Sequence, residues 1–209
     1  MASKTETLHQ DKLFTLKQTI LDNGLKVCTV ETDRLGKQSM IDVDVQVGSF
    51  ANPFDGSGIA HFVEHMVFNG IPGHDNEQSL KKYINDIGGT GLNAATGYSR
   101  THYKVQIGRD FAEQALKICA DLTLKAKLAD KHFEKERDVI IKEMKMYDDN
   151  FRSIFVENLK GASYGDQPFS WSQLGTEDLF RTLTPDDLRN FYNTHYVPNR
   201  ITMVVGGHV

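Results

Sequence analysis

Residues 58–70, GIAHFVEHMVFNG, contain two histidines and a glutamate that can share one face of a helix. At about 100° per residue, His61, Glu64 and His65 fall within one narrow sector. Apolar residues at i, i+3 and i+4 spacing form a stripe of the kind that faces a protein core; they are Ile59, Phe62, Val63, Met66 and Val67. The segment therefore predicts an amphipathic helix whose polar face carries chemically reactive groups.

Two imidazoles four residues apart can reach the same metal ion, because residues i and i+4 are neighbours on a helix. Zinc favours nitrogen ligands in tetrahedral geometry, and a catalytic zinc keeps one position for water. Zinc lowers the pKa of that water to about 7, and a carboxylate beside it can take the proton. His61 and His65 thus predict a zinc site, with Glu64 as the base for attack on a peptide carbonyl. The order HxxEH is typical of the inverzincin metallopeptidases.

A second predicted helix, at residues 130–147, can supply an acidic third ligand. Its apolar residues recur at helical spacing, and Asp130 is a candidate N-cap. Glu136 and Glu143 lie seven residues apart, about two helical turns, so they share a face. Most glutamates on helices are simply solvated. The residues alone leave the choice between Glu136 and Glu143 open.

Three segments make the chain similar to the N-terminal domain of the pitrilysin/insulinase family of zinc metallopeptidases. They are FVEHMVFNG, GLNAATGYSRTHY and FEKERDVIIKEM, and the resemblance covers nearly the whole chain. It implies that the zinc ligands are His61, His65 and Glu143. It also implies that Glu64 is the general base and that Glu136 is a neighbouring acid outside the ligand set.

The resemblance implies a substrate site as well. In the family, the NAAT segment forms a sheet edge beside the zinc, and the backbone of the substrate pairs with it. The matching residues of this chain are Asn93, Ala94, Ala95 and Thr96. The expected substrate is therefore a peptide or an unfolded segment of a protein.

Members of the family carry further related domains, one of which supplies an arginine and a tyrosine that hold the substrate carbonyl. We expect these two groups to come from outside residues 1–209. We therefore expect residues 13–209 to form a single peptidase domain that is part of a longer chain. Residues 1–12 are polar and are expected to form an N-terminal tail. Further domains or a partner subunit of the same family are the expected partners. Alone, the domain should fold and bind zinc but hydrolyse peptides weakly.

Three functions fit a domain with this site. A zinc-dependent metalloendopeptidase is favoured, because every chemical residue of the family motif is present. The alternative is a non-catalytic peptide-binding or assembly subunit, although relatives of that kind usually lose a motif residue. A structural zinc module is disfavoured, because two histidines, one glutamate and a water leave the site open, whereas structural zinc sites are closed.

The composition is that of a globular domain, with 209 residues of which 39% are hydrophobic and 25% charged. A net charge of -4 gives no electrostatic basis for binding nucleic acid or an anionic membrane. Cys28 and Cys119 offer no disulfide framework. The start of the chain lacks the apolar run of a secretory signal, and no transmembrane segment is predicted. We therefore expect a cytoplasmic location.

Periodicity and turn signals predict the elements that position these residues. Asn23-Gly24 indicates a type I′ turn within a hairpin at residues 14–31. Residues 41–47 alternate apolar and polar side chains, which predicts a strand with one buried face. Further helices are predicted at residues 77–87, 110–128, 130–159 and from residue 184, and further strands at residues 102–107 and 200–205. This order favours an α+β fold with helices on one face of a mixed, largely antiparallel sheet.

Overall fold

The computed structural model describes residues 3–207, which contain one seven-stranded sheet. The strands are β1 (Lys4–Gln10), β2 (Thr15–Ile20), β3 (Lys26–Glu31), β4 (Gln38–Val45), β5 (Thr90–Thr96), β6 (Thr101–Gly108) and β7 (Ile201–Gly207). The helices are α1 (Ile59–Val67), α2 (Glu77–Asp86), α3 (Ala112–Leu124), α4 (Asp130–Asp148), α5 (Phe151–Tyr164), α6 (Glu177–Phe180) and α7 (Pro185–His195). Short 3₁₀ helices occupy Ser49–Ala51, Arg109–Phe111 and Pro198–Arg200.

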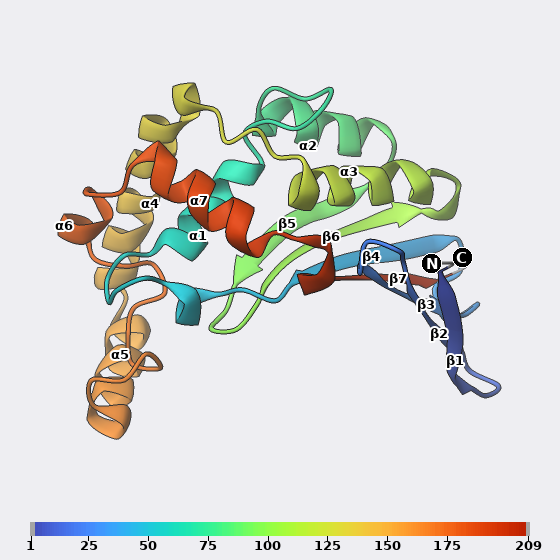
Figure 1. Cartoon of the computed structure of the whole chain (residues 1–209), viewed down its shortest axis with the longest axis horizontal. Helices are drawn as coiled ribbons and strands as arrows, with labels where there is room; N and C mark the ends of the chain where they lie inside the picture. Colours follow the sequence, from blue (N-terminus) through green and yellow to red (C-terminus); the bar gives the residue numbers. More distant parts are fainter. Residues whose placement is uncertain (1–2, 208–209) are drawn as a thin grey trace.

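The strand order is β1-β2-β3-β7-β4-β6-β5, so β5 lies at one edge of the sheet. The β3–β7 pair is parallel and the other neighbouring pairs are antiparallel. Helices α1, α2, α3 and α7 lie along one side of the strands (Figure 1). The predicted α+β class, with helices on one face of a mixed and largely antiparallel sheet, is confirmed.

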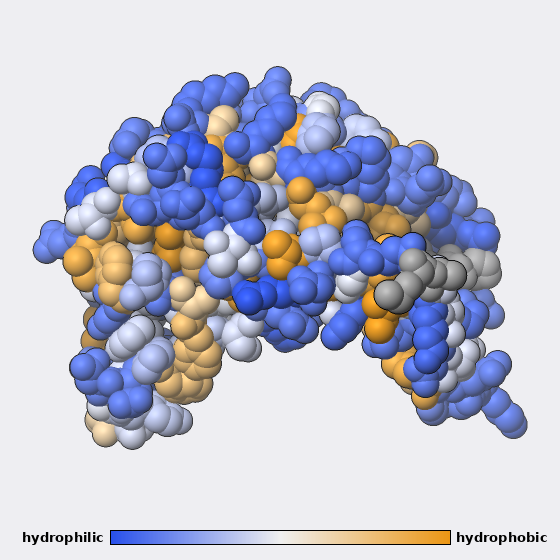
Figure 2. All heavy atoms as spheres, viewed as in Figure 1, coloured by the Kyte–Doolittle hydropathy of each residue, from blue (hydrophilic) through white to orange (hydrophobic). Residues whose placement is uncertain are grey.

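Two parts of the molecule project away from the helical layer. Helix α5 extends from one end, and the β1–β2 hairpin extends from the other (Figure 1). Between these two projections the space-filling surface is hollowed, so that the molecule has an arched outline (Figure 2). The open face of the sheet therefore forms the inner side of the arch.

The hydrophobic core lies between the sheet and its helices. Strand β4 buries Ile41, Val43 and Val45 on the helical side, whereas Asp42 and Asp44 alternate with them and are only partly buried. This alternation is the one predicted for residues 41–47. The apolar stripe predicted for residues 58–70 is also buried, so α1 is an interior helix whose position is fixed by packing.

The start of α1 depends on a glycine. Gly58 has a φ of +61°, and a Cβ atom at this position would lie 2.1 Å from the carbonyl oxygen of Leu174. The backbone N–H of Ala60 donates a hydrogen bond of 3.2 Å to Oδ1 of Asn52. Helix α1 is therefore held at its N-terminus by the segment just before it, at Asn52, and by the distant loop at Leu174.

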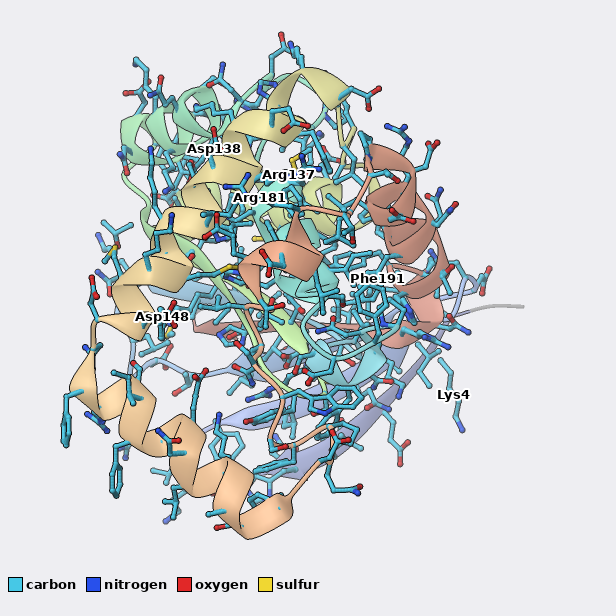
Figure 3. The ribbon with its side chains drawn as sticks, turned by 90° about the vertical axis from the view of Figure 1, so that its left-hand side faces the viewer. Lys4, Arg137, Asp138, Asp148, Arg181 and Phe191 are labelled. Atoms are coloured by element: carbon cyan, nitrogen blue, oxygen red, sulfur yellow. The ribbon has the colours of Figure 1, made fainter. Side chains whose placement is uncertain are left out.

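The structure differs from the sequence prediction at residues 130–159, which form two helices instead of one. The Asn150 side chain accepts hydrogen bonds from the backbone N–H groups of Arg152 and Ser153, at 3.0 and 3.2 Å. An asparagine that caps a new helix in this way ends the preceding one. Figure 3 shows α4 and α5 in succession, with Asp148 at the end of α4.

Strand β1 is a second difference, because it lies within the segment predicted to be a polar tail. All seven of its residues are exposed, and it is held by antiparallel pairing with β2. A strand that buries no side chain leaves no apolar alternation to recognise. The predicted 14–31 hairpin is confirmed as β2 and β3. Its turn is not type I′, because that turn needs a positive φ at both Asn23 and Gly24, and only Gly24 has one.

Cys28 and Cys119 are both free thiols. Within residues 3–207, no helix is both long enough and apolar enough to cross a membrane.

Candidate metal centre

The polar face of α1 is directed toward α4 and the edge strand β5, both of which pack against this helix. His61 and Glu64 are buried, and His65 is partly buried. Their clustering follows directly from the i, i+3, i+4 spacing predicted for the helix. Helix α4 supplies the acidic groups that face them.

The three predicted zinc ligands lie close together. Nε2 of His61 is 3.8 Å from Oε2 of Glu143, and Nε2 of His65 is 3.6 Å from the same oxygen. One ligand atom from each residue lies within 4.8 Å of the others. Ligands bound tetrahedrally to zinc are about 3.4 Å apart. Two nitrogens and one carboxylate oxygen at this spacing fit a single zinc ion.

Glu136 meets the other side of the His65 ring. Its Oε2 lies 3.5 Å from Nδ1 of His65, while Nε2 of that ring faces Glu143. A carboxylate beside Nδ1 fixes the tautomer and orientation of the ring and leaves Nε2 free to bind a metal. Burial opposes ionisation of Glu136, but the His65 ring outweighs it, and the pKa of Glu136 lies below its ordinary value. The two acids that periodicity left equivalent thus have different partners.

The ionisation of the two histidines differs. Burial, together with the charge of His65, lowers the pKa of His61 to about 3. Burial also opposes protonation of His65, but Glu136, Glu64 and Glu143 outweigh it and raise its pKa. A neutral imidazole is the form that binds metal. At neutral pH, His61 therefore carries the lone pair that a metal ligand needs.

Glu64 is held separately from the group of three ligand atoms. Its Oε2 accepts a hydrogen bond from the Oγ1 of Thr96, which ends strand β5. Burial raises the pKa of Glu64, and the hydrogen bond from Thr96 opposes this effect. Glu64 therefore lies beside the candidate metal site, on the side of the sheet edge.

A cavity of about 590 Å³ opens over the cluster. It is lined by Glu64 and the three candidate ligands, by residues 93–96 of β5, and by side chains of α5. Because β5 is the last strand of the sheet, its outer edge is available for pairing with an extended chain. All eight residues predicted from sequence as ligands, base or substrate contacts line this one cavity, whereas Glu136 lies behind His65.

The contribution of α5 was missed by the sequence prediction. Arg152, Val156, Glu157 and Lys160 line the cavity from this helix. Their presence there depends on the change of direction at Asn150, which the apolar periodicity of residues 130–159 conceals. The only signal in the sequence is Asn150 itself, a residue type that favours helix N-caps.

A family model described as Insulinase (Peptidase family M16) matches residues 27–177. The chain is 34% identical to the mitochondrial-processing peptidase subunit beta of Caenorhabditis elegans, over 91% of this chain and 41% of that protein. It is 28% identical to the uncharacterised zinc protease YmxG of Bacillus subtilis (strain 168), over 93% of this chain and 47% of the relative. The chain thus spans less than half the length of these relatives.

Solved structures show the same fold. A protease from Helicobacter pylori superimposes with a TM-score of 0.86 at 25% identity, covering 93% of this chain and 47% of that protein. The crystal structure of pitrilysin gives a TM-score of 0.86 at 23% identity, covering 100% of this chain and 23% of pitrilysin. At this identity the likeness to pitrilysin concerns the fold alone.

Proposed function

The chain belongs to the insulinase family, Peptidase family M16, and we propose that it forms the catalytic domain of a zinc-dependent metalloendopeptidase. The proposed reaction is hydrolysis of peptide bonds in peptides or unfolded protein segments. One observation carries the proposal: Nε2 of His61, Nε2 of His65 and Oε2 of Glu143 converge in a cavity that also contains the Glu64 carboxylate and an open sheet edge.

His61, His65 and Glu143 are the proposed zinc ligands, and Glu136 orients the ring of His65. This donor set is of the kind that catalytic zinc sites use, and relatives of the chain carry the name zinc protease. When bound, zinc lowers the pKa of a coordinated water to about 7 and polarises the carbonyl of the scissile bond.

Glu64 is the proposed general base. Its carboxylate faces the cavity but is held by Thr96 and stands apart from the ligand atoms. From this position Glu64 takes a proton from the attacking water and returns it to the nitrogen of the leaving amine. Burial favours this exchange, because a raised pKa brings a carboxylate closer to neutral pH.

The substrate is proposed to bind as an added strand. Asn93, Ala94, Ala95 and Thr96 lie on the free edge of β5, and their backbone N–H and C=O groups can pair with an extended peptide. Main-chain pairing accepts many sequences and requires an unfolded segment. The opposite wall of the cavity, formed by α5, is then next to the substrate side chains.

The chain spans only part of its relatives, so the activity of the whole protein is part of the proposal. Further domains or a partner subunit of the same family are proposed to complete the cavity, as the word subunit in the names of several relatives suggests. Residues 1–209 alone are accordingly proposed to bind zinc but to cleave peptides slowly. The cytoplasmic location remains a prediction.

Metal analysis combined with a fluorogenic peptide assay tests the proposal on the protein that contains this domain. We expect about one zinc per chain, and cleavage that stops when zinc is removed and returns when it is restored. A protein that binds both zinc and peptide without cleaving the peptide would instead be the non-catalytic subunit. Absence of zinc at His61, His65 and Glu143 would overturn the proposal.

A further inference from the structure

The carboxylate of Glu64 is tied to the sheet through a threonine. Oγ1 of Thr96 donates a hydrogen bond to Oε2 of Glu64, although the two residues are 32 positions apart in sequence. An ionised carboxylate can only accept hydrogen bonds, so the hydroxyl must be the donor. The contact joins the helix that carries two candidate ligands to the strand that forms the open edge.

The hydroxyl of Thr96 is itself placed by a second threonine. Thr101 faces Thr96 across the β5–β6 pair, and their Oγ1 atoms are 3.4 Å apart. Thr101 is fully buried and donates its proton to the carbonyl oxygen of Val47 at 3.0 Å. Because each hydroxyl has one proton, Thr101 has none left to donate to Thr96, and the proton of Thr96 is the one donated to Glu64.

Buried tyrosines extend this hydroxyl cluster into the core. The hydroxyl oxygens of Tyr103 and Tyr196 are 2.8 Å apart, and Tyr196 also interacts with the side chain of Thr101. Both tyrosines are almost completely buried. The atoms that hold Thr96 therefore belong to the buried interior, where side chains have little freedom to move.

The side chain and the backbone of Thr96 have different neighbours, because side chains alternate between the two faces of β5. Leu92 and Thr96 lie on the side of β5 that faces α1, whereas Asn93 and Ala95 are exposed on the other side. The side chain of Thr96 is thus engaged with Glu64, while its backbone lies on the free edge. The family resemblance placed Thr96 only among the substrate contacts.

We propose that Thr96 is a positioning residue, which fixes the carboxylate of Glu64 for proton transfer. The proposal rests on the proposed role of Glu64 as general base. A base must be held within a fraction of an ångström of its productive position. A β-branched threonine has a restricted χ1 angle, and the neighbouring Thr101 limits the movement of Thr96 further. The consequence is that loss of the hydroxyl should slow the chemical step and leave substrate binding unchanged.

Three variants of the protein that contains this domain test the proposal. Thr96→Val keeps the size of the side chain but removes the donor, and Thr96→Ser keeps the donor. Thr90→Val makes the same change at the exposed, distant end of β5. We expect Thr96→Val to lower kcat roughly 10- to 100-fold, as loss of a hydrogen bond to a charged group does. KM, zinc content and Tm should stay near wild type. Thr96→Ser, which keeps the donor, should recover most of the kcat that Thr96→Val loses, and Thr90→Val should behave like the wild type.

A readout independent of activity separates this proposal from the function on which it rests. Crystal structures of the zinc-loaded wild type and Thr96→Val should show the Glu64 carboxylate displaced only in the variant. If the wild type cleaves no peptide, the proposed function fails, while a displaced Glu64 would still establish positioning. An unmoved carboxylate, an unchanged kcat, or equal losses in Thr96→Val and Thr96→Ser would overturn the proposal. A joint loss of kcat, zinc and Tm would also overturn it, because it would show a merely structural role.

Discussion

Glu136 and Glu143 occupy one face of α4 but meet different nitrogens of His65. The two turns between them place one acid on each side of the ring. Glu143 also approaches His61, so it is the acid that can share a metal with both histidines. Glu136 is deeper, with 8% of its side chain exposed against 30% for Glu143, and is suited to holding the ring in place.

This division of roles predicts a ranking of zinc affinity. His65→Ala should remove most of the bound zinc, and Glu143→Gln should weaken binding strongly, because each removes a ligand. Glu136→Gln should weaken binding less, by roughly 10- to 100-fold, because it removes only a partner of a ligand. Competition with a chromogenic chelator measures all three affinities. A larger loss for Glu136→Gln than for Glu143→Gln would show that the acids have been assigned the wrong way round.

At the residue scale, the sequence predicts those contacts that are local in the chain. His61, Glu64 and His65 lie within five residues of one helix, so helical geometry alone brings them together. The choice of Glu143 required the family resemblance, because helical spacing treats both acids alike. The bond from Thr96 to Glu64 was not predicted, since it depends on the packing of α1 against β5.

At the element scale, α1 is positioned by the close approach of its first turn to the loop before α6. Gly58 combines a φ of +61° with a carbonyl oxygen where a Cβ would be, whereas Gly73 has a φ of +86° and no atom within 4 Å of that position. A substitution at Gly73 therefore tests backbone strain alone, whereas a substitution at Gly58 tests strain and steric contact together.

We expect Gly73→Ala to lower the free energy of unfolding by about 1 kcal/mol, which is the cost of the left-handed conformation. Gly58→Ala should cost at least about 2 kcal/mol, because the chain at Leu174 must also move. Urea denaturation of the two variants measures both values. Equal costs would mean that the contact between the start of α1 and the Leu174 loop does not constrain the helix.

The elements that were predicted correctly have strong local signals. The β2–β3 hairpin around Asn23-Gly24 and the alternation of β4 are examples, and both depend on neighbouring residues. Strand β1 has no such signal, because pairing with β2 involves its backbone and buries none of its side chains. The break before α5 was missed because the cap formed by Asn150 competes with a helical pattern that continues through it.

At the scale of the whole molecule, the candidate metal site joins parts that are far apart in the chain. Helix α1 and helix α4 each supply ligands, and the two helices are otherwise in contact through apolar side chains such as Phe62 and Phe133. The α+β class could be predicted from the order of the elements. The strand order, the arch and the projection of α5 could not, because they depend on tertiary packing.

A metal that binds only the folded state stabilises it, by about 2.7 kcal/mol when its concentration is a hundredfold above Kd. We therefore expect chelation of zinc to lower the Tm of the wild-type protein, and readdition of zinc to restore it. Calorimetry with and without chelator measures this shift, and His65→Ala is the control that should show almost none. An equal shift in both proteins would mean that the metal acts elsewhere in the molecule.

The central claim is that Glu64 acts on the substrate reaction and does not bind the metal. Its most direct test measures zinc content and peptide hydrolysis together in Glu64→Gln, in the protein that contains this domain. We predict about one zinc per chain, as in the wild type, and a loss of hydrolysis of roughly 10²- to 10⁴-fold. Loss of zinc would make Glu64 a ligand, and hydrolysis at the wild-type rate would contradict its role as the base.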